Sequence, residues 1–242
     1  MTHSQLSEHH LSLLRQYDTP TICNVIELFQ VRPRTEGYMD GRIRACFPEM
    51  PPVVGYAATA MFRGTLDRAG EAGYATLDDQ IKAFEALPAP HIVVFQDLDD
   101  PPAAATFGEI MCSSYQRFGA VGLITSGAAR DLEQVRRLGF PVFSSGAVCS
   151  HGYTQILWPG VAVRVGGLVV RPGDLLHGDA NGVTHIPPEI ASEVAEAAAE
   201  FVAAEKVVLD FVAAGSADLA KWSEARREMV RRIGRLSERL RR

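Results

Sequence analysis

Helix-like and strand-like segments alternate at short intervals between residues 107 and 148. The stretch "FGEIMCSSYQRFG" is typical of a helix, "AVGLITSG" of a strand, "ARDLEQVRRLG" of a helix and "FPVFSSGAV" of a strand. The joints between them are short and contain glycine. A helix that links two such strands returns the chain to the same edge of a sheet, so the strands run parallel. This alternation predicts an α/β fold.

The flanking segments fit this fold. Apolar alternation predicts a strand at residues 52–62, and a short apolar run predicts a buried strand at residues 91–98. Apolar spacing predicts helices at residues 5–30, 76–87 and 188–214. Asp18 and Thr19 cap a restart of the first helical region ahead of Pro20, and Thr76 with Asp79 resembles a capping box. After Pro159, short apolar runs broken by Gly, Pro and Asn predict an antiparallel β-meander.

Composition restricts the class of protein. The 242 residues are 47% hydrophobic and 22% charged, as in a globular protein with a substantial core. A net charge of -5 gives no general reason to expect nucleic acid or an anionic membrane as a partner. The four cysteines lack C-x-x-C spacing, and neither a signal peptide nor a membrane-spanning apolar run is recognised. We therefore expect free thiols and a cytoplasmic protein.

The C-terminal segment, residues 216–242, differs from the remainder. It holds nine Lys/Arg against four Asp/Glu, which makes it +5 while residues 1–215 carry -10. We treat 1–215 as the main domain and 216–242 as a basic helical extension. The extension could bind RNA or an acidic protein surface. We favour docking on a neighbouring subunit, because its apolar residues recur at helical spacing: Trp222, Met229, Ile233, Leu236 and Leu240.

A charged constellation falls within the alternating region. Glu109 and Arg130 are separated by twenty residues, and Asp131 follows Arg130 directly. The helix and strand between them could bring both ends to the carboxyl edge of the sheet, where α/β proteins bind ligands. Gly108 would let backbone amides approach an anion, and Arg130 could grip a carboxylate with two hydrogen bonds. Asp131 and Glu109 could serve a hard divalent cation, one directly and the other through water, and magnesium suits such a site.

Simpler interpretations exist for these motifs. An Arg-Asp pair that opens a helix is more often a cap with a surface charge, and spacing alone favours that reading. The stretch "GDANGV" (178–183) is too short for a calcium loop, so we interpret it as a hairpin turn.

The residues from Gly108 through "GAARD" to "GFPVFSSG", followed by "PGDLLHGDANGVTHIP", resemble the RraA-like / HMG aldolase family. This family contains class II 4-hydroxy-4-methyl-2-oxoglutarate and 4-carboxy-4-hydroxy-2-oxoadipate aldolases together with ribonuclease E regulators. The resemblance covers about residues 20–210. It implies an α-β-β-α sandwich related to swivelling phosphohistidine domains. It also implies homotrimers or homohexamers whose active sites lie between subunits.

The resemblance also implies roles for single residues. Asp131 matches the family's direct metal ligand, and Arg130 matches its contact to the pyruvyl carboxylate. Glu109 stands where the aldolases have an acidic residue outside the direct ligands, and the loop of Gly108, Glu109, Ile110 and Met111 matches the one whose amides hold substrate. A glutamate from the neighbour's C-terminal helix orders water at the metal; Glu205 is the candidate.

Three positions depart from the family pattern: Gln134 and Asn24 stand where an acidic residue is usual, and Phe107 where a Trp is common. These departures bear on substrate identity more than on metal binding. His151 and Tyr153 follow "SSGAVC", where a family loop approaches the pocket, although a turn histidine is more often structural. His177 and His185 are expected to be framework residues.

The resulting hypothesis is a lyase that cleaves a C–C bond of a 4-hydroxy-2-oxo acid and releases pyruvate through its enolate. A divalent cation, Mg²⁺ or Mn²⁺, would stabilise the enolate as a Lewis acid. Loss of carbon dioxide from oxaloacetate gives the same enolate, so decarboxylase activity is a natural side reaction. Two alternatives stay open: a non-catalytic regulator that binds a ribonuclease or another protein, and an enzyme of another reaction type that reuses this site. No strand–GxGxxG–helix unit suggests a methyltransferase.

Overall fold

The computed structural model describes residues 5–67 and 75–241. Its centre is an eight-stranded sheet in the order β1-β7-β5-β3-β2-β12-β13, with β9 paired to β2. The strands are β1 (Arg44–Ala45), β2 (Val53–Arg63), β3 (His91–Asp97), β5 (Ala120–Thr125), β7 (Val142–Ser144), β9 (Gln155–Leu157), β12 (Leu175–Asp179) and β13 (Gly182–Ile186). Strands β2, β3, β5 and β7 run parallel, and the alternating pattern predicted this for β5 and β7.

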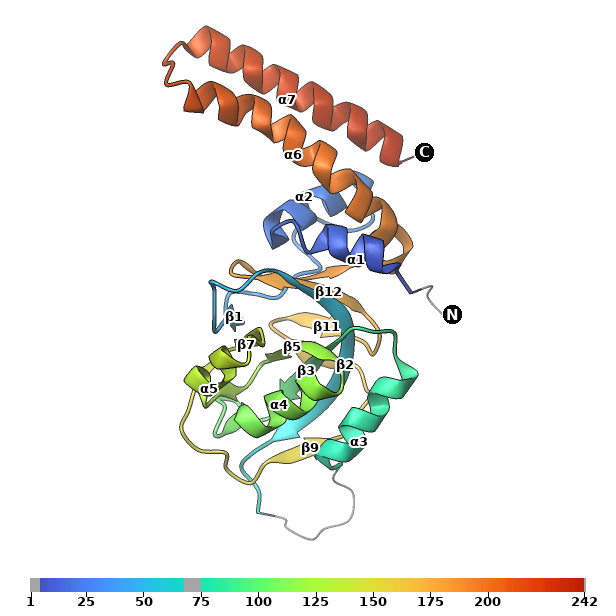
Figure 1. Cartoon of the computed structure of the whole chain (residues 1–242), viewed down its shortest axis with the longest axis vertical. Coiled ribbons are helices and arrows are strands. Elements are labelled where there is room, and N and C mark those ends of the chain that lie inside the picture. The colour runs from blue at the N-terminus through green and yellow to red at the C-terminus, as the bar shows by residue number, and fades with distance from the viewer. Residues whose placement is uncertain (1–4, 68–74, 242) are drawn as a thin grey trace.

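Helices cover one face of this sheet (Figure 1). They are α3 (Leu77–Lys82) with the 3-10 turn η1 (Ala83–Ala86), α4 (Glu109–Arg117) and α5 (Leu132–Arg137). Val93 and Phe95 of β3 pack in the core beneath them. The alternate residues Ile92 and Val94 pack in a second core with the hairpin of β10 (Val163–Val165) and β11 (Leu168–Val170). Successive strand residues point to opposite faces, so the β3 sequence supplies both cores.

The expected helix over 76–87 is shorter than its pattern. Thr76 caps α3 through the predicted capping box with Asp79, and the chain tightens into η1 after Lys82. The expected meander is divided as well. Strands β10 and β11 form a separate two-stranded sheet, whereas β12 and β13 extend the main sheet. The turn at 178–183 is the hairpin turn that the sequence indicated.

A third, very small sheet was not anticipated from the sequence. It contains β4 (Ala105–Phe107), β6 (Ala128–Ala129) and β8 (Gly146–Ala147), all parallel. Strand β4 leads directly into α4, and β6 leads directly into α5. The sheet therefore places the start of α4 beside the start of α5.

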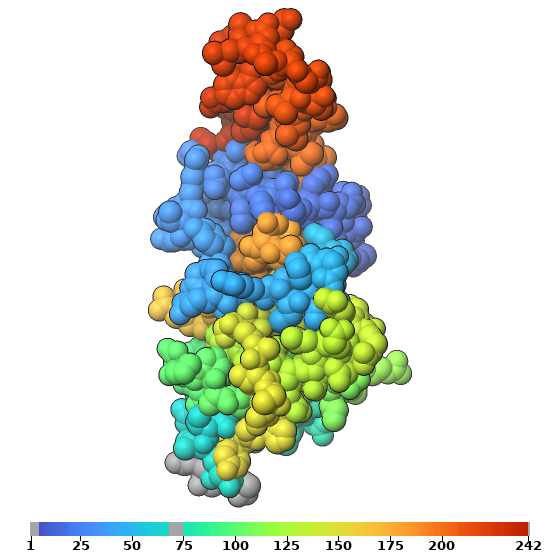
Figure 2. Space-filling view, turned by 90° about the vertical axis from the view of Figure 1, so that its left-hand side faces the viewer, coloured from blue at the N-terminus to red at the C-terminus, as the bar shows by residue number. Residues whose placement is uncertain are grey.

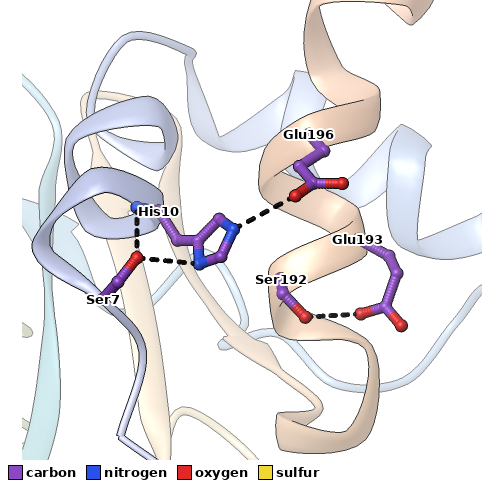
Figure 3. Close-up of polar contacts among 5 residues, drawn as sticks. All are labelled: Ser7, His10, Ser192, Glu193 and Glu196. Atoms are coloured by element: carbon purple, nitrogen blue, oxygen red, sulfur yellow. Dashed lines mark hydrogen bonds and ion pairs between the residues drawn. The ribbon is translucent and has the colours of Figure 1, made fainter.

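The N-terminal helices α1 (Glu8–Leu14) and α2 (Thr19–Phe29) pack with the first half of α6 (Ala191–Ala213) over the β12 end of the sheet (Figure 1). Asp18 caps α2 by accepting from the Thr21 amide at 2.8 Å, as predicted. Polar contacts join α1 to α6: His10 Nε2 lies 3.2 Å from Glu196 Oε1, while Ser7 bonds the other ring nitrogen of His10 (Figure 3).

Helix α6 follows the short turn η2 (Pro188–Ile190) and ends at Ala213, two residues before Gly215, whose φ of +72° suits glycine. Helix α7 (Leu219–Leu240) then folds back along α6 and α2. The two helices project from the α1/α2 end of the molecule (Figures 1 and 2). No helix within the described residues is both long and apolar enough to cross a membrane.

Candidate active site

The small sheet brings together the two segments that hold the predicted site residues, 108–111 and 130–131. Gly108 is the residue before α4, and Asp131 is the residue before α5. Asp131 Oδ2 accepts a hydrogen bond from the Glu109 amide at 3.1 Å. Arg130 Nε lies 3.8 Å from the same oxygen. One carboxylate oxygen of Asp131 is thus approached both by its neighbour Arg130 and by the amide of Glu109, which lies twenty-two positions away in the sequence.

Asp131 does not act as an ordinary helix cap. Its backbone is left-handed, with φ 55° and ψ 37°, and its side chain makes no capping bond to α5. The left-handed conformation is uncommon outside glycine, although aspartate tolerates it better than most residues. The carboxylate instead reaches across to α4. The simpler interpretation of the Arg-Asp pair, a cap with a surface charge, therefore does not describe this structure.

Gly108 is required by the closeness of the two loops. A Cβ at this position would lie 2.5 Å from Asp131 Oδ2 and 3.1 Å from Arg130 Nε. Real Cβ atoms do not approach other heavy atoms at 2.5 Å, so any side chain here would displace the carboxylate. The backbone of Gly108 itself is extended, at φ -150°. A glycine is needed at position 108 because no side chain fits beside Asp131, and not because the backbone angle is unusual.

A small pocket of about 110 Å³ opens at this point. Its walls include Gly108, Ile110 and Met111 from the α4 side and Arg130 from the α5 side. The side chains of Arg130 and Asp131 are about one-third exposed, so both remain accessible to a ligand. His151 and Thr154 complete the rim, in agreement with the loop position suggested for His151, whereas Tyr153 is not a lining residue. Phe107 lines the pocket from the core.

Two of the predicted residues are less involved within one chain. Glu109 contributes its backbone amide, and its side chain is exposed at the start of α4. Glu205 lies in α6, on the part of the molecule that rises away from α4 and α5 (Figure 1). Partial burial, and then the nearby Asp18 carboxylate, raise the pKa of Glu205. One chain does not bring Glu205 to Asp131, and its contribution from a neighbouring subunit stays a prediction.

The donor set favours a hydrated cation. No group of three or more His, Cys, Asp or Glu side chains suited to a metal occurs in residues 5–67 and 75–241. A tetrahedral zinc cage needs such a group. Magnesium retains several waters and uses one or two protein carboxylates, and Asp131, whose Oδ2 is anchored by the Glu109 amide, could be one of them.

Sequence reasoning missed Asp97, at the end of β3. Burial raises the pKa of the Asp97 carboxyl to about 6. Its Oδ2 is shielded from solvent and has no hydrogen-bond partner among the described residues. A single aspartate after an apolar strand resembles a turn residue, and nothing in its spacing linked it to Arg130 and Asp131.

A larger cavity of about 1070 Å³ lies along the carboxyl ends of β3, β5 and β7. Its lining carries both signs of charge, from Arg42, Arg44 and Arg164 and from Asp97, Asp99 and Asp100. Leu132, the residue after Asp131, is part of this wall. The candidate site therefore borders the cavity on the far side of the β6–α5 junction.

Comparisons with known proteins identify the family to which this chain is similar. A family model of the RraA-like family, described as Aldolase/RraA, matches residues 19–184. A Halalkalibacterium halodurans protein named "Putative 4-hydroxy-4-methyl-2-oxoglutarate aldolase" is 34% identical over 143 residues, which are 57% of this chain and 67% of that protein. Protein DlpA of Legionella pneumophila is 26% identical over 128 residues, 52% of this chain but only 21% of DlpA.

Solved structures share the fold. An uncharacterised Pseudomonas syringae protein superposes with a TM-score of 0.73 at 21% identity, over 93% of this chain and 96% of its own. Streptomyces coelicolor RraAS2, described as an unusual member of the RNase ES inhibitor RraA family, gives 0.66 at 22% identity over 84% and 96%. At these identities the likeness establishes the mixed α/β architecture.

Proposed function

The chain belongs to the RraA-like aldolase family, and we propose that it is a divalent-metal-dependent lyase that cleaves a 4-hydroxy-2-oxo acid to release pyruvate. The observation that carries this proposal is the shared carboxylate oxygen. Asp131 Oδ2 is fixed by the Glu109 amide at 3.1 Å and stands 3.8 Å from Arg130 Nε. An anion grip and a hard-cation ligand are therefore held side by side, and Arg130 lines the small pocket.

Substrate binding is assigned to Arg130 and the start of α4. The partly exposed guanidinium of Arg130 would bind the carboxylate of the 2-oxo acid in a planar, two-bond contact. The Glu109 amide is bonded to Asp131 Oδ2, but the next amides of α4, at residues 110 and 111, have no partner within their helix and point toward the helix N-terminus, which favours negative charge. Both features recognise the pyruvyl half that all 4-hydroxy-2-oxo acids share.

Asp131 is assigned as the direct protein ligand of Mg²⁺ or Mn²⁺. The cation supplies Lewis-acid stabilisation of the enolate that C–C cleavage leaves behind. The chain's own part is to hold the carboxylate in one position through the Glu109 amide and to hold the substrate carboxylate through Arg130. Loss of carbon dioxide from oxaloacetate would require the same groups, so decarboxylation is proposed as a side activity.

Glu205 of a second subunit is proposed to complete the site. Its carboxyl, whose pKa is raised by burial and by Asp18, suits proton exchange with water or substrate. This role requires a homotrimer or homohexamer in which α6 of one subunit approaches α4 and α5 of the next. Asn24 in α2 and Gln134 in α5 would then influence the part of the substrate that varies between 4-hydroxy-2-oxo acids.

A non-catalytic regulator is the second candidate. The observation that favours it is the set of arginines on α7 with no carboxylate within salt-bridge distance in the described chain: Arg226, Arg227 and Arg235. Such a surface could bind an acidic protein. The contact between Asp131 and the Glu109 amide is not needed for that role, so we prefer the lyase.

The deciding experiment measures pyruvate release from a panel of 4-hydroxy-2-oxo acids and from oxaloacetate, with Mg²⁺, with Mn²⁺ and with EDTA. The lyase proposal expects metal-dependent release from at least one 4-hydroxy-2-oxo acid. Release from oxaloacetate alone would indicate a decarboxylase of another type. No release from any substrate at any metal concentration would contradict the lyase and favour the regulator.

A further inference from the structure

A second pocket, of about 240 Å³, lies between α2 and the β12–β13 hairpin. Its third wall is formed by residues from the segment 32–39, which follows α2 in the chain. This pocket shares no lining residue with the one at Gly108 and Arg130. Helix α2 lies over the β12 end of the sheet, whereas α4 and α5 cover its helical face (Figure 1). The proposed lyase site therefore does not account for this pocket.

The walls of this second pocket are largely apolar. Its apolar side chains are those of Pro20, Ile26, Pro33, Tyr38, Met39 and Val183. The Tyr38 side chain is 46% exposed, so its ring is not covered by the chain's own packing. At about 30 Å³ for each water molecule, the pocket has the volume of roughly eight waters. Its size and walls suit a small ligand with an apolar body.

Arg32 is the charged group built into this pocket. The side chain is partly buried, and its Nη1 donates to the His185 carbonyl at 2.9 Å while its Nη2 donates to Thr184 Oγ1 at 3.3 Å. Of the five guanidinium hydrogens, those on Nε and one on Nη2 have no acceptor among the described residues. No carboxylate of residues 5–67 and 75–241 forms a salt bridge with Arg32, although Glu36 and Glu189 act on it at longer range.

The guanidinium of Arg32 occupies the space that a side chain at position 37 would fill. A Cβ on Gly37 would lie 1.9 Å from Arg32 Cζ, and the φ of Gly37 is +89°. The Gly37 carbonyl accepts from Thr184 Oγ1 and from the His185 amide, both at 2.9 Å. The same two residues thus fix the guanidinium and the backbone beside it. A cation that is already fixed loses little freedom when an anion binds.

The other polar groups of the pocket leave the charge of Arg32 available. Arg34 Nε lies 3.4 Å from Glu27 Oε2, so these two opposite charges pair with each other. Burial raises the pKa of the Cys23 thiol, which therefore stays neutral near pH 7. Glu36 is exposed and makes no ion pair within the described part of the chain. A bound anion would have to compete only with this exposed side chain for Arg32.

We propose that this pocket binds a small monocarboxylate with a compact apolar body, whose carboxylate is held by Arg32 and whose body lies against Tyr38 and the apolar walls. A carboxylate matches the planar guanidinium through two parallel hydrogen bonds. A second negative charge on the ligand would meet Glu27 and Glu36 in the same lining, which favours a monoanion. The inference goes beyond the proposed lyase function and does not depend on it.

Isothermal titration calorimetry of the 242-residue protein with benzoate, without metal or substrate, tests the proposal. We expect one site per chain with a Kd on the order of 1 mM, as for a small ligand with one charged anchor. Benzamide retains the ring without the charge, and acetate retains the charge without the ring, so each should bind at least about tenfold more weakly. Arg130→Gln should bind benzoate as the parent does. Absence of benzoate binding, or equal binding of benzamide, would overturn the proposal.

Variants of the lining identify the anchor. Arg32→Gln removes the charge but keeps an amide that can donate to the His185 carbonyl, and benzoate should bind at least about tenfold more weakly. The matched control Arg34→Gln removes the same charge from a paired, exposed arginine and should stay within about threefold of the parent. Glu36→Gln should tighten binding, because it removes the competing carboxylate. Equal losses in Arg32→Gln and Arg34→Gln would contradict the role of Arg32.

The apolar wall is tested separately. Tyr38→Ala should weaken benzoate binding about threefold or more, since it removes the exposed ring, while Tyr38→Phe should bind as the parent does. If Arg32→Gln does not fold, this pair and Glu36→Gln still decide. Parent-like affinity in both Tyr38→Ala and Glu36→Gln would then place benzoate outside the pocket and overturn the proposal.

Cys23 reports where the ligand binds, because it lines the pocket. Saturating benzoate should slow alkylation of Cys23 by iodoacetamide several-fold at about pH 8.5, as followed by peptide mass spectrometry. The exposed Cys149 lies outside this lining and should react at an unchanged rate. Alkylation of Cys23 that proceeds equally fast with and without bound benzoate would overturn the assignment of the pocket. If Cys23 does not react in the free protein, the calorimetric series decides alone.

Discussion

The carboxylate of Asp131 is fixed by the backbone of Glu109, 3.1 Å from its Oδ2, instead of by its own helix. Asp131→Asn keeps an oxygen that can accept this bond and keeps a residue that tolerates the left-handed backbone, but it removes the charge. We expect the unfolding temperature to stay within a few degrees and metal-dependent turnover to fall at least 100-fold. Asp131→Ala should abolish turnover. The measurements are thermal unfolding, Mn²⁺ binding by electron paramagnetic resonance, and pyruvate release. Unchanged activity that still requires metal would disprove the ligand assignment.

A substitution at Gly108 tests whether the close approach of α4 to the Asp131 carboxylate matters for activity. In Gly108→Ala the new methyl group would meet Asp131 Oδ2 at 2.5 Å, so the carboxylate must move away from the Glu109 amide. Because a side chain can shift more easily than backbone, we expect a stability loss of only about 1 kcal/mol but a kcat at least tenfold lower. Gly41→Ala is the control, since no heavy atom lies within 4 Å of its Cβ position. Equal kcat in both variants would show that the close approach has no functional role.

Arg130 is expected to recognise the substrate carboxylate through the shape of its guanidinium. Arg130→Lys retains the charge but loses the planar two-bond grip. A charge-assisted hydrogen bond contributes roughly 1.5–3 kcal/mol, so we expect the KM for the 2-oxo acid to rise roughly 10- to 100-fold. The exposed Arg137, on the next turn of α5, provides the matched Arg137→Lys control. Parent-like kinetics in Arg130→Lys would make Arg130 a structural residue.

His177, expected from the sequence to be a framework residue, ties α1 and α2 to the sheet. Its Nε2 bonds the Leu14 carbonyl at 3.1 Å and its Nδ1 bonds Thr19 Oγ1 at 2.9 Å. Burial lowers the pKa of the fully buried ring. The unfolded state therefore binds a proton that the folded state refuses, and the free energy of unfolding falls as the pH drops below about 6.5, by up to about 1.4 kcal/mol per pH unit.

The His177→Gln variant isolates this effect. A glutamine amide can donate to Leu14 and accept from Thr19 without titrating, so we expect unfolding by urea to show a weaker dependence between pH 5 and pH 7 than in the parent. The exposed His9 serves for the control substitution His9→Gln, which should keep the parent's slope. Identical slopes in the parent and in His177→Gln would contradict the assignment.

Part of this architecture is visible in the sequence because it follows periodic patterns. The apolar run in residues 91–98 predicts β3, and the Asp18 and Thr76 caps mark helix starts that the structure confirms. Strands β4, β6 and β8 are too short for any period to be recognised, yet they bring Gly108 beside Asp131. The left-handed backbone of Asp131 is equally hidden, because tertiary contacts and not its residue type determine it. Asp97 is similarly hidden, because a single aspartate after an apolar strand resembles a turn residue.

The basic C-terminal helix provides the last prediction. Its apolar face, expected to dock on a neighbour, is covered by its own chain: Leu236 is 1% exposed, and Ser237 donates to the Leu28 carbonyl at 2.9 Å. Arg239 pairs with Glu200 of α6. Leu219 and Val230, 72% and 57% exposed, remain free for contact with another subunit. Deletion of 216–242 should therefore uncover apolar surface on α2 and α6.

We expect that deletion to lower the free energy of unfolding by several kcal/mol, at about 1.5–3 kcal/mol for each large apolar side chain fully removed from water. Assembly mass in light scattering should change, and pyruvate release should fall, because Glu205 would no longer be presented to a neighbour on a supported α6. The double variant Arg226→Gln/Arg227→Gln removes two positive charges but retains the helix. This charge-only variant should keep the assembly mass and the activity of the parent. If instead the truncated protein keeps its mass and activity while the charge-only variant loses a salt-sensitive partner, the helix is a basic binding arm and docking is wrong.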